Sequence, residues 1–167
     1  MTLKAAQGPL VGVKIIELAG IGPGPLCSAL LADMGADILR IDRPVPADIG
    51  GPRPARACVA RRGRYSVSVD LKNLPGVATI LRLAKNADAI LDPFRPGGTE
   101  RLGLGPDDVF ARNKRIIYGR MTGWGQDGPL GQAAGHDLNY LAITGVLNAI
   151  GPKEMPVPPL NVVADMG

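Results

Sequence analysis

Residues 11–41, VGVKIIELAGIGPGPLCSALLADMGADILRI, decide the fold of the chain. The apolar and β-branched run at 11–18 predicts a strand, and the glycines and prolines of 19–25 predict a turn behind it. Apolar residues then recur at helical spacing, which predicts a helix over 25–34 that ends before a glycine. A second strand at 36–41 completes a β-α-β unit, in which the helix crosses over a parallel sheet.

The alternation of strand and helix patterns continues through the rest of the chain. Further strands are predicted at 65–69, 89–91 and 116–118, and further helices at 74–87, 106–112 and 137–150. Residues 42–63 are rich in Pro, Gly and Arg and lack an apolar period, which predicts a long irregular loop. We therefore expect an α/β fold, with an open, mostly parallel Rossmann-like sheet and flanking helices. A length of 167 residues, 46% of them hydrophobic, suits one core and favours one domain over 1–167.

The basic residues are unevenly distributed. The formal net charge is +4, and seven arginines fall in one stretch: Arg40, Arg43, Arg53, Arg56, Arg61, Arg62 and Arg64. A concentrated basic loop favours an anionic partner, and Arg40 and Arg43 flank the strand end where α/β sheets bind phosphates. The alternative is a solvated charged loop. Nucleic acid is not the expected anion, because aromatic residues make up 4% of the chain and do not alternate with the arginines.

Composition also bounds the cellular compartment. Cys27 and Cys58 lie 31 residues apart without a second Cys or a His nearby, which fits neither a zinc site nor a disulfide framework. We therefore expect no metal and two reduced thiols. The sequence shows no signal-peptide pattern and no run of about 18 uncharged apolar residues, so we expect a cytoplasmic protein without a membrane span.

One motif imitates a dinucleotide-binding fingerprint. Gly22-Pro23-Gly24 follows the first predicted strand, and Asp42 comes about twenty residues later. However, Cys27 occupies the position of the third glycine, and Pro23 and Pro25 remove backbone donors that a pyrophosphate would use. Nicotinamide binding is therefore disfavoured, and the turn is either purely structural or lines a different ligand.

The only histidine lies in the segment 135–140, which reads GHDLNY, and Asp165 follows it by 29 residues. Histidine titrates near neutral pH without help, so His136 and Asp165 form a candidate acid and base pair. His136 or Asp137 is predicted to begin the helix over 137–150, and the alternative role of His136 is that of a structural cap. The alternative for Asp165 is a solvated side chain, and sequence spacing does not show that the two residues meet.

Nine segments resemble the family III CoA transferases, and in particular the α-methylacyl-CoA racemase branch of that family. They occur in the family's order and span almost the whole chain: 17–25, 31–37, 40–44, 69–72, 94–97, 100–106, 117–126, 135–140 and 159–165. The histidine indicates the branch. The family's transferases use an aspartate that corresponds to Asp165 as a nucleophile, whereas its racemases combine that aspartate with a histidine that corresponds to His136.

The resemblance implies epimerisation of 2-methylacyl-CoA thioesters. Inversion removes the α-proton from one face of the carbon and returns a proton to the other face, through an enolate. In this reading His136 serves the face of the S epimer and Asp165 serves that of the R epimer. Two alternatives remain open: a family III CoA transferase with Asp165 as its nucleophile, and a non-catalytic acyl-CoA or nucleotide-binding module.

The resemblance also implies which residues bind the CoA thioester. The matching segments contribute Arg43, Val69, Asp70, Leu71, Lys72, Pro93, Phe94, Arg95, Arg101, Gly135, His136, Asp137, Leu138, Asn139 and Tyr140. No separate cofactor is expected, because CoA is part of the substrate.

The family's architecture adds an expectation about the working unit. Family members are roughly twice as long, add a small second domain and a returning segment, and form interlocked homodimers whose other subunit supplies a glutamate to the histidine. The 167 residues are therefore expected to be the N-terminal, CoA-binding part of the large domain. Such a part alone is expected to be weak or inactive, because its histidine lacks an orienting carboxylate.

Overall fold

The computed structural model describes residues 7–45, 58–160 and 163–166. The chain divides into two compact units, 1–121 and 122–167, which are described separately. Among the described residues, no helix is long and apolar enough to span a membrane.

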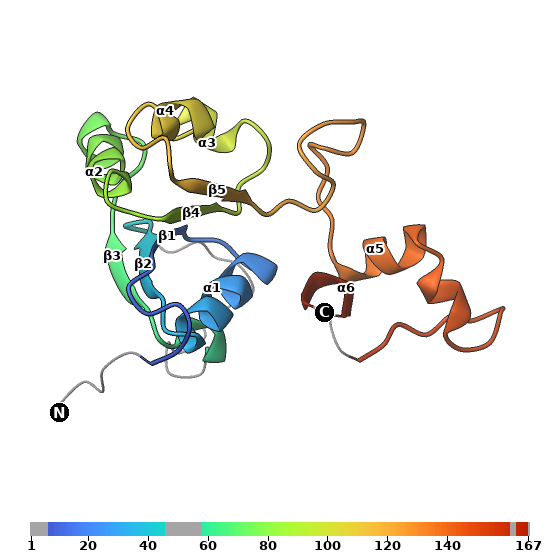
Figure 1. Ribbon diagram of the computed structural model, residues 1–167. Coiled ribbons are helices and arrows are strands. Elements are labelled where there is room, and N and C mark those ends of the chain that lie inside the picture. The colour runs from blue at the N-terminus through green and yellow to red at the C-terminus, as the bar shows by residue number, and fades with distance from the viewer. Residues whose placement is uncertain (1–6, 46–57, 161–162, 167) are drawn as a thin grey trace. The chain divides into compact units, whose positions relative to one another are not determined.

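The first unit is built around a five-stranded parallel sheet, which confirms the predicted fold class (Figure 1). Its strands are β1 (Lys14–Leu18), β2 (Asp37–Asp42), β3 (Tyr65–Ser68), β4 (Ala89–Asp92) and β5 (Ile117–Arg120). Their spatial order is β3-β2-β1-β4-β5, and every neighbouring pair is parallel. The chain thus runs from β1 through β2 to β3 at one edge of the sheet. It then crosses back to β4, on the other side of β1, and continues to β5 at the opposite edge.

Helices connect these strands. The described helical segments of the first unit are α1 (Pro23–Asp33), the 3-10 turn η2 (Val59–Arg61), α2 (Leu74–Ala84), α3 (Gly98–Arg101) and α4 (Pro106–Phe110). The helix α1 has a proline in its first turn and ends just before Gly35, whose φ of 98° lies in the left-handed region that glycine adopts readily. The helix α2 begins behind Asn73, whose side-chain oxygen accepts a hydrogen bond from the Gly76 amide at 2.8 Å.

The strands direct alternate side chains into two apolar layers. On one face of the sheet, Ile16 and Leu18 of β1 pack with Ile80 of α2. On the other face, Ile15 packs in a smaller cluster that includes Leu31 of α1. The core is therefore a three-layer sandwich in which both faces of the parallel sheet are covered by helices.

A buried ion network crosses the sheet on the α1 side. Glu17 of β1 is 1% exposed, and its carboxylate accepts hydrogen bonds from Arg40 Nη1 at 2.8 Å and from Arg64 Nη1. Arg40 Nε also lies 3.1 Å from both carboxylate oxygens of Asp42. The Arg64 side chain is 1% exposed, so both guanidinium groups are held inside the protein by one central carboxylate.

These contacts correct the prediction for the arginine-rich stretch. Arg40 was expected to hold a phosphate, but it is 8% exposed because it alternates in β2 with core residues, and its partners are the carboxylates of Glu17 and Asp42. Arg62 pairs with Asp33 at the surface. Residues 46–57 of the predicted loop over 42–63, including Arg53 and Arg56, lie outside the described residues.

The second unit contains the short elements α5 (Asp137–Ile143), the 3-10 turn η3 (Val146–Ala149) and α6 (Val163–Met166). The single helix predicted over 137–150 is wrong in length. It stops at Ile143, because Gly145 takes a left-handed φ of 80° and the chain restarts as a 3-10 turn.

Replacement of Glu17 tests the buried network. Glu17→Ala is expected to lower the free energy of unfolding by about 3–5 kcal/mol, because it leaves two buried guanidinium groups without their shared carboxylate. Urea denaturation followed by circular dichroism measures the change. Asp33→Ala is the matched control, because it breaks an exposed ion pair and should cost less than about 1 kcal/mol. Equal losses in the two variants would contradict the network's role.

Candidate functional site

The carboxyl ends of the five strands lie at one edge of the sheet, as the parallel order requires. Three of the predicted CoA-contacting segments follow these ends directly. Arg43 comes after β2, residues 69–72 come after β3, and residues 93–95 come after β4. The fold therefore brings residues as far apart in sequence as Arg43 and Arg95 to the same edge of the first unit.

This edge contains a topological switch point. The chain leaves β1 toward β2 and leaves the adjacent strand β4 toward β5, and such diverging connections open the crevice where α/β sheets bind ligands. The two connections approach each other closely. A Cβ atom on Gly20 would lie 2.5 Å from Pro93 Cγ, and one on Gly24 would lie 3.4 Å from Pro93 Cβ. Packing against Pro93 thus explains Gly20, which precedes the motif that imitates a dinucleotide fingerprint, whereas a Cβ on Gly24 would make an ordinary contact.

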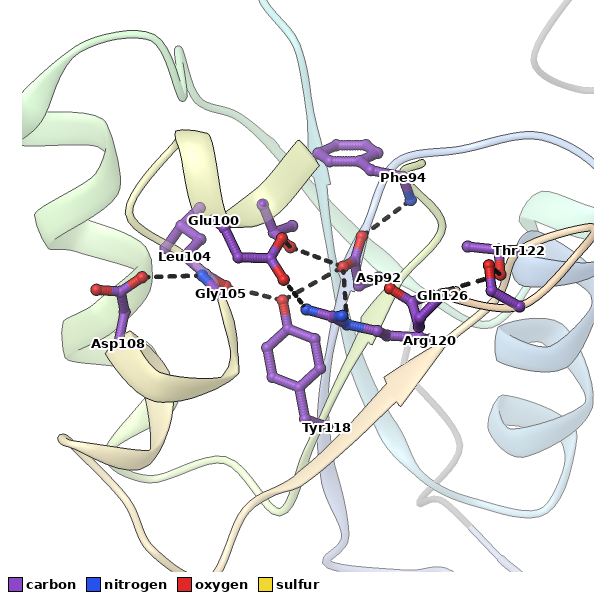
Figure 2. A network of polar contacts seen from close by, with 12 residues as sticks. Asp92, Phe94, Glu100, Leu104, Gly105, Asp108, Tyr118, Arg120, Thr122 and Gln126 are labelled. Atoms are coloured by element: carbon purple, nitrogen blue, oxygen red, sulfur yellow. Dashed lines mark hydrogen bonds and ion pairs between the residues drawn. The ribbon is translucent and has the colours of Figure 1, made fainter. Parts of the chain in front are cut away.

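A buried carboxylate fixes the turn behind β4 (Figure 2). Asp92 is 3% exposed, and its Oδ1 accepts a hydrogen bond from the Phe94 amide at 2.9 Å. Its Oδ2 accepts a hydrogen bond from Thr99 Oγ1 at 2.8 Å and lies 3.9 Å from Arg120 Nε. Both ends of the turn over 93–98 are therefore tied to one side chain at the end of the strand.

Tyr118 and Arg120 of β5 complete this network. Tyr118 Oη donates to the Leu104 carbonyl at 2.8 Å and lies 3.4 Å from Asp92 Oδ2. Burial raises the pKa of Tyr118 above its usual range, so the phenol stays neutral and keeps its proton for this bond. The Arg120 guanidinium lies 5.5 Å from the centre of the Tyr118 ring and pairs with Glu100. Sequence reasoning missed this network, because a single Asp, Tyr or Arg at a strand end forms no pattern.

The predicted cations of the first unit are all solvent-exposed. They are Arg43, Lys72, Arg95 and Arg101. The guanidinium of Arg101 folds back on the turn over 93–98, since a Cβ on Gly97 would lie 2.9 Å from its Nη1. Asp70 instead accepts hydrogen bonds from the Lys72 amide at 2.9 Å and from Asn73 Nδ2 at 3.1 Å, so its carboxylate shapes the turn that begins α2.

The second unit brings the two predicted catalytic residues together. His136 is the N-cap of α5, and its backbone amide donates to Asn139 Oδ1 at 3.0 Å. Asp165 lies in α6, and its Oδ2 is 3.9 Å from His136 Nδ1. The His136 side chain is 66% exposed and that of Asp165 is 15% exposed, so the imidazole is accessible and the carboxylate is partly shielded.

An aromatic pair supports the segment that carries His136. The rings of Trp124 and Tyr140 meet edge to face with centroids 5.0 Å apart, and Trp124 Nε1 donates to the Ala134 carbonyl at 3.3 Å. A Cβ on Gly135 would lie 2.7 Å from both Trp124 Nε1 and Tyr140 Oη, so any other residue there would have to displace one of the two aromatic side chains. Burial, with a smaller contribution from the Asp165 carboxylate, raises the pKa of Tyr140. Trp124 was not predicted as a site residue.

Two further residues of this unit that were predicted to bind the thioester lie in different surroundings. Leu138 is 50% exposed, and Asn139 serves as the capping partner of His136. Within the described part of the chain, no three His, Cys, Asp or Glu side chains gather in a way that could hold a metal ion.

Known proteins resemble nearly the whole chain. The family model described as CoA-transferase family III matches residues 10–167. Alpha-methylacyl-CoA racemase of Mus musculus is 44% identical over 159 residues, which cover 95% of this chain and 40% of that protein. The probable fatty acyl-CoA transferase Rv3272 of Mycobacterium tuberculosis is 37% identical over 155 residues, which cover 87% of this chain and 39% of that protein.

A solved structure agrees with these relatives. The crystal structure of Rv3272 from Mycobacterium tuberculosis matches with a TM-score of 0.84 and 34% identity, and the match covers 96% of this chain and 47% of that one. The chain thus spans about two fifths of the length of the curated relatives it matches. One relative is named a racemase and another a probable transferase, so the similarity alone does not choose between the two chemistries.

Gly135→Ala tests the packing behind His136. The added methyl group is expected to displace the Trp124 indole, and because Trp124 is the only tryptophan, its fluorescence reports the change directly. A shifted emission maximum is expected for Gly135→Ala. Gly131→Ala is the matched control, because its Cβ would lie no closer than 3.4 Å to a neighbouring atom. An unchanged emission spectrum of Gly135→Ala would show that the space is open.

Proposed function

The chain belongs to CoA-transferase family III, and from this premise we propose that the whole protein interconverts the R and S epimers of 2-methylacyl-CoA thioesters. The observation that carries the proposal is the convergence of His136 Nδ1 and Asp165 Oδ2 to 3.9 Å. The 44% identity to a relative named alpha-methylacyl-CoA racemase supports the same reaction class.

Epimerisation at the α-carbon needs two groups that reach one atom from opposite sides. One group removes the α-proton, the thioester stabilises the resulting enolate, and the second group returns a proton to the other face. His136 acts on the face of the S epimer and Asp165 on that of the R epimer, and their roles exchange with the direction of the reaction. Reacting atoms sit about 3–3.5 Å apart, so the two side chains must separate beyond 3.9 Å to admit the α-carbon.

The carboxyl edge of the sheet is the proposed binding region for CoA. CoA carries a pyrophosphate and a 3′-phosphate, and the exposed cations Arg43, Lys72 and Arg95 come from three connections at that edge. Guanidinium groups hold phosphates through paired hydrogen bonds, which suits this placement. No separate cofactor enters the proposal, because the thioester itself supplies the electron sink.

The apolar surface of the second unit supports a further partner for the whole protein. Its described residues Ile143, Met155 and Leu160 are 65%, 66% and 105% exposed. Large exposed apolar side chains in such number are typical of a surface that another part of a protein or an apolar ligand covers. The acyl tail of the substrate, or the second subunit of the interlocked homodimer expected of the family, would cover this surface.

A CoA transferase is the second candidate. The relative named probable fatty acyl-CoA transferase is 37% identical, and Asp165 is the carboxylate that would attack the thioester. In that reaction Asp165 forms an acyl anhydride and expels the CoA thiolate, and His136 is not required.

Hydrogen exchange at the α-carbon decides between the candidates. The protein at its natural length is expected to incorporate deuterium from heavy water into both epimers of a 2-methylacyl-CoA. His136→Ala should slow exchange from the S epimer, and Asp165→Ala should slow exchange from the R epimer, each by about 100-fold or more. Mass spectrometry of the recovered thioester measures the incorporation.

Two results would sink the racemase reading. The first is the absence of exchange in the unmodified protein. The second is CoA transfer that survives His136→Ala together with an acyl group on Asp165 that hydroxylamine traps, which favours the transferase.

Asp92→Ala tests the proposed CoA region. Loss of the carboxylate releases the amide of Phe94 and the hydroxyl of Thr99, so the turn over 93–98 loosens. Affinity for CoA should fall about tenfold, the equivalent of one lost hydrogen bond of about 1.4 kcal/mol. Isothermal titration with CoA measures this. The exposed Asp107 in α4 provides the control Asp107→Ala, whose affinity should match that of the unmodified protein. Unchanged affinity in Asp92→Ala would exclude the turn from the CoA site.

A further inference from the structure

Asp137 joins the two segments that carry the proposed acid and base. Its Oδ1 accepts hydrogen bonds from the Ala164 amide at 2.6 Å and from the Asp165 amide at 3.1 Å. The residue immediately before it is His136. We infer that Asp137 is a positioning residue, whose carboxylate holds Asp165 opposite His136. The inference rests on the proposed function of this pair.

The physical basis is the unpaired start of a helix. The first amides of any α-helix lack intrahelical partners, and a side-chain oxygen usually satisfies them from the residue just before the helix. In α6 (Val163–Met166) the oxygen comes from Asp137, which lies 27 residues from Ala164 in sequence. The cap therefore also acts as a long-range tether between α5 and α6.

The tether acts on the backbone of Asp165 itself. One of the two amides that it holds belongs to Asp165, and the other belongs to the preceding residue. The two hydrogen bonds thus fix the backbone on both sides of the bond that joins Ala164 to Asp165, from which the Asp165 side chain projects. A hydrogen bond from an amide to a charged carboxylate is stronger than a neutral one, so two such bonds hold the start of α6 firmly.

The other end of the tether is also fixed. Asp137 is the first residue of α5, and the amide of His136 is bound by Asn139 Oδ1 at 3.0 Å. The backbones of His136 and Asp165 are consequently both tied to the first turn of α5. The 3.9 Å approach of their side chains is thus built on two backbone segments that share the first turn of α5. Asp137 Oδ1 is occupied by two amides, and in the proposed reaction this carboxylate holds another residue in place.

A positioning role predicts a selective kinetic defect. Asp165 removes the proton from the R epimer, so a loosened α6 slows that step, whereas His136 still removes the proton from the S epimer. A displacement of about 1 Å costs about 100-fold in rate. A side-chain substitution at Asp137 leaves its backbone in place for the thioester contact expected of this residue, so kcat is expected to fall while KM stays constant.

The test compares Asp137→Ala and Asp137→Asn in the protein at its natural length, with deuterium exchange measured from each epimer. In Asp137→Ala, kcat for exchange from the R epimer should fall about 100-fold with KM within about twofold. The S epimer should still gain deuterium, but with retained configuration. Asp137→Asn keeps a side-chain carbonyl acceptor of the same shape. Its kcat for exchange from the R epimer should therefore be about tenfold higher than that of Asp137→Ala. The exposed Asp127 gives the control Asp127→Ala, which should behave like the unmodified protein.

The outcomes separate this inference from the function on which it rests. Absence of exchange in the unmodified protein refutes the racemase reaction itself. Normal exchange in both Asp137 variants, or an equal loss for the two epimers with a raised KM, overturns the positioning role while the reaction stands.

Discussion

The parallel strand order around β1 is the constraint on which the first unit depends. β1 pairs in parallel with β2 on one side and with β4 on the other. The chain continues from β1 to β2 and from β4 to β5, in opposite directions across the sheet. This arrangement gathers every strand's carboxyl end at one edge and makes the connections after β1 and β4 diverge there. Because Gly20 packs against Pro93 at that point, the two connections are also held in mutual contact.

Two buried carboxylates organise the sheet near this edge, one on each face. Glu17 lies on the α1 face and binds the guanidinium groups of Arg40 and Arg64, whereas Asp92 lies on the α2 face and ties the turn behind β4. A buried charge is costly unless it is paired and hydrogen-bonded, and both carboxylates meet that condition. The two buried carboxylates are thus satisfied within the fold, although Nε and Nη2 of the buried Arg64 have no hydrogen-bond partner among the described residues, and Arg43 and Lys72 remain exposed at the edge.

The sequence predicts the sheet well and the side-chain partners poorly, for physical reasons. Each strand is a short apolar run between turn residues, so its presence is visible locally. By contrast, α3 and α6 have four residues each, too few to show a helical period. The helix predicted over 137–150 was too long. The aliphatic residues continue past Gly145 in the sequence, but the backbone turns at this glycine and ends the helix.

The same limit applies to the candidate site. Arg40 and Arg43 look alike in sequence, yet alternation within β2 buries the first and leaves the second exposed. Residue chemistry made His136 and Asp165 a candidate acid and base pair, and resemblance to a family gave them their roles. Their meeting depends on Asp137 and α6, a contact between residues 27 and 28 positions apart that no local pattern encodes.

Hydrogen-deuterium exchange of the protein at its natural length, with and without CoA, most directly tests the claim that the carboxyl edge of the sheet binds CoA. CoA is expected to slow exchange in peptides that cover 69–73 and 93–98. The opposite edge carries a groove lined by Lys14, Asp37 and Tyr65, at the starts of β1, β2 and β3, and exchange there should not change. Slowed exchange confined to that groove, with the peptides over 69–73 and 93–98 unaltered, would contradict the account.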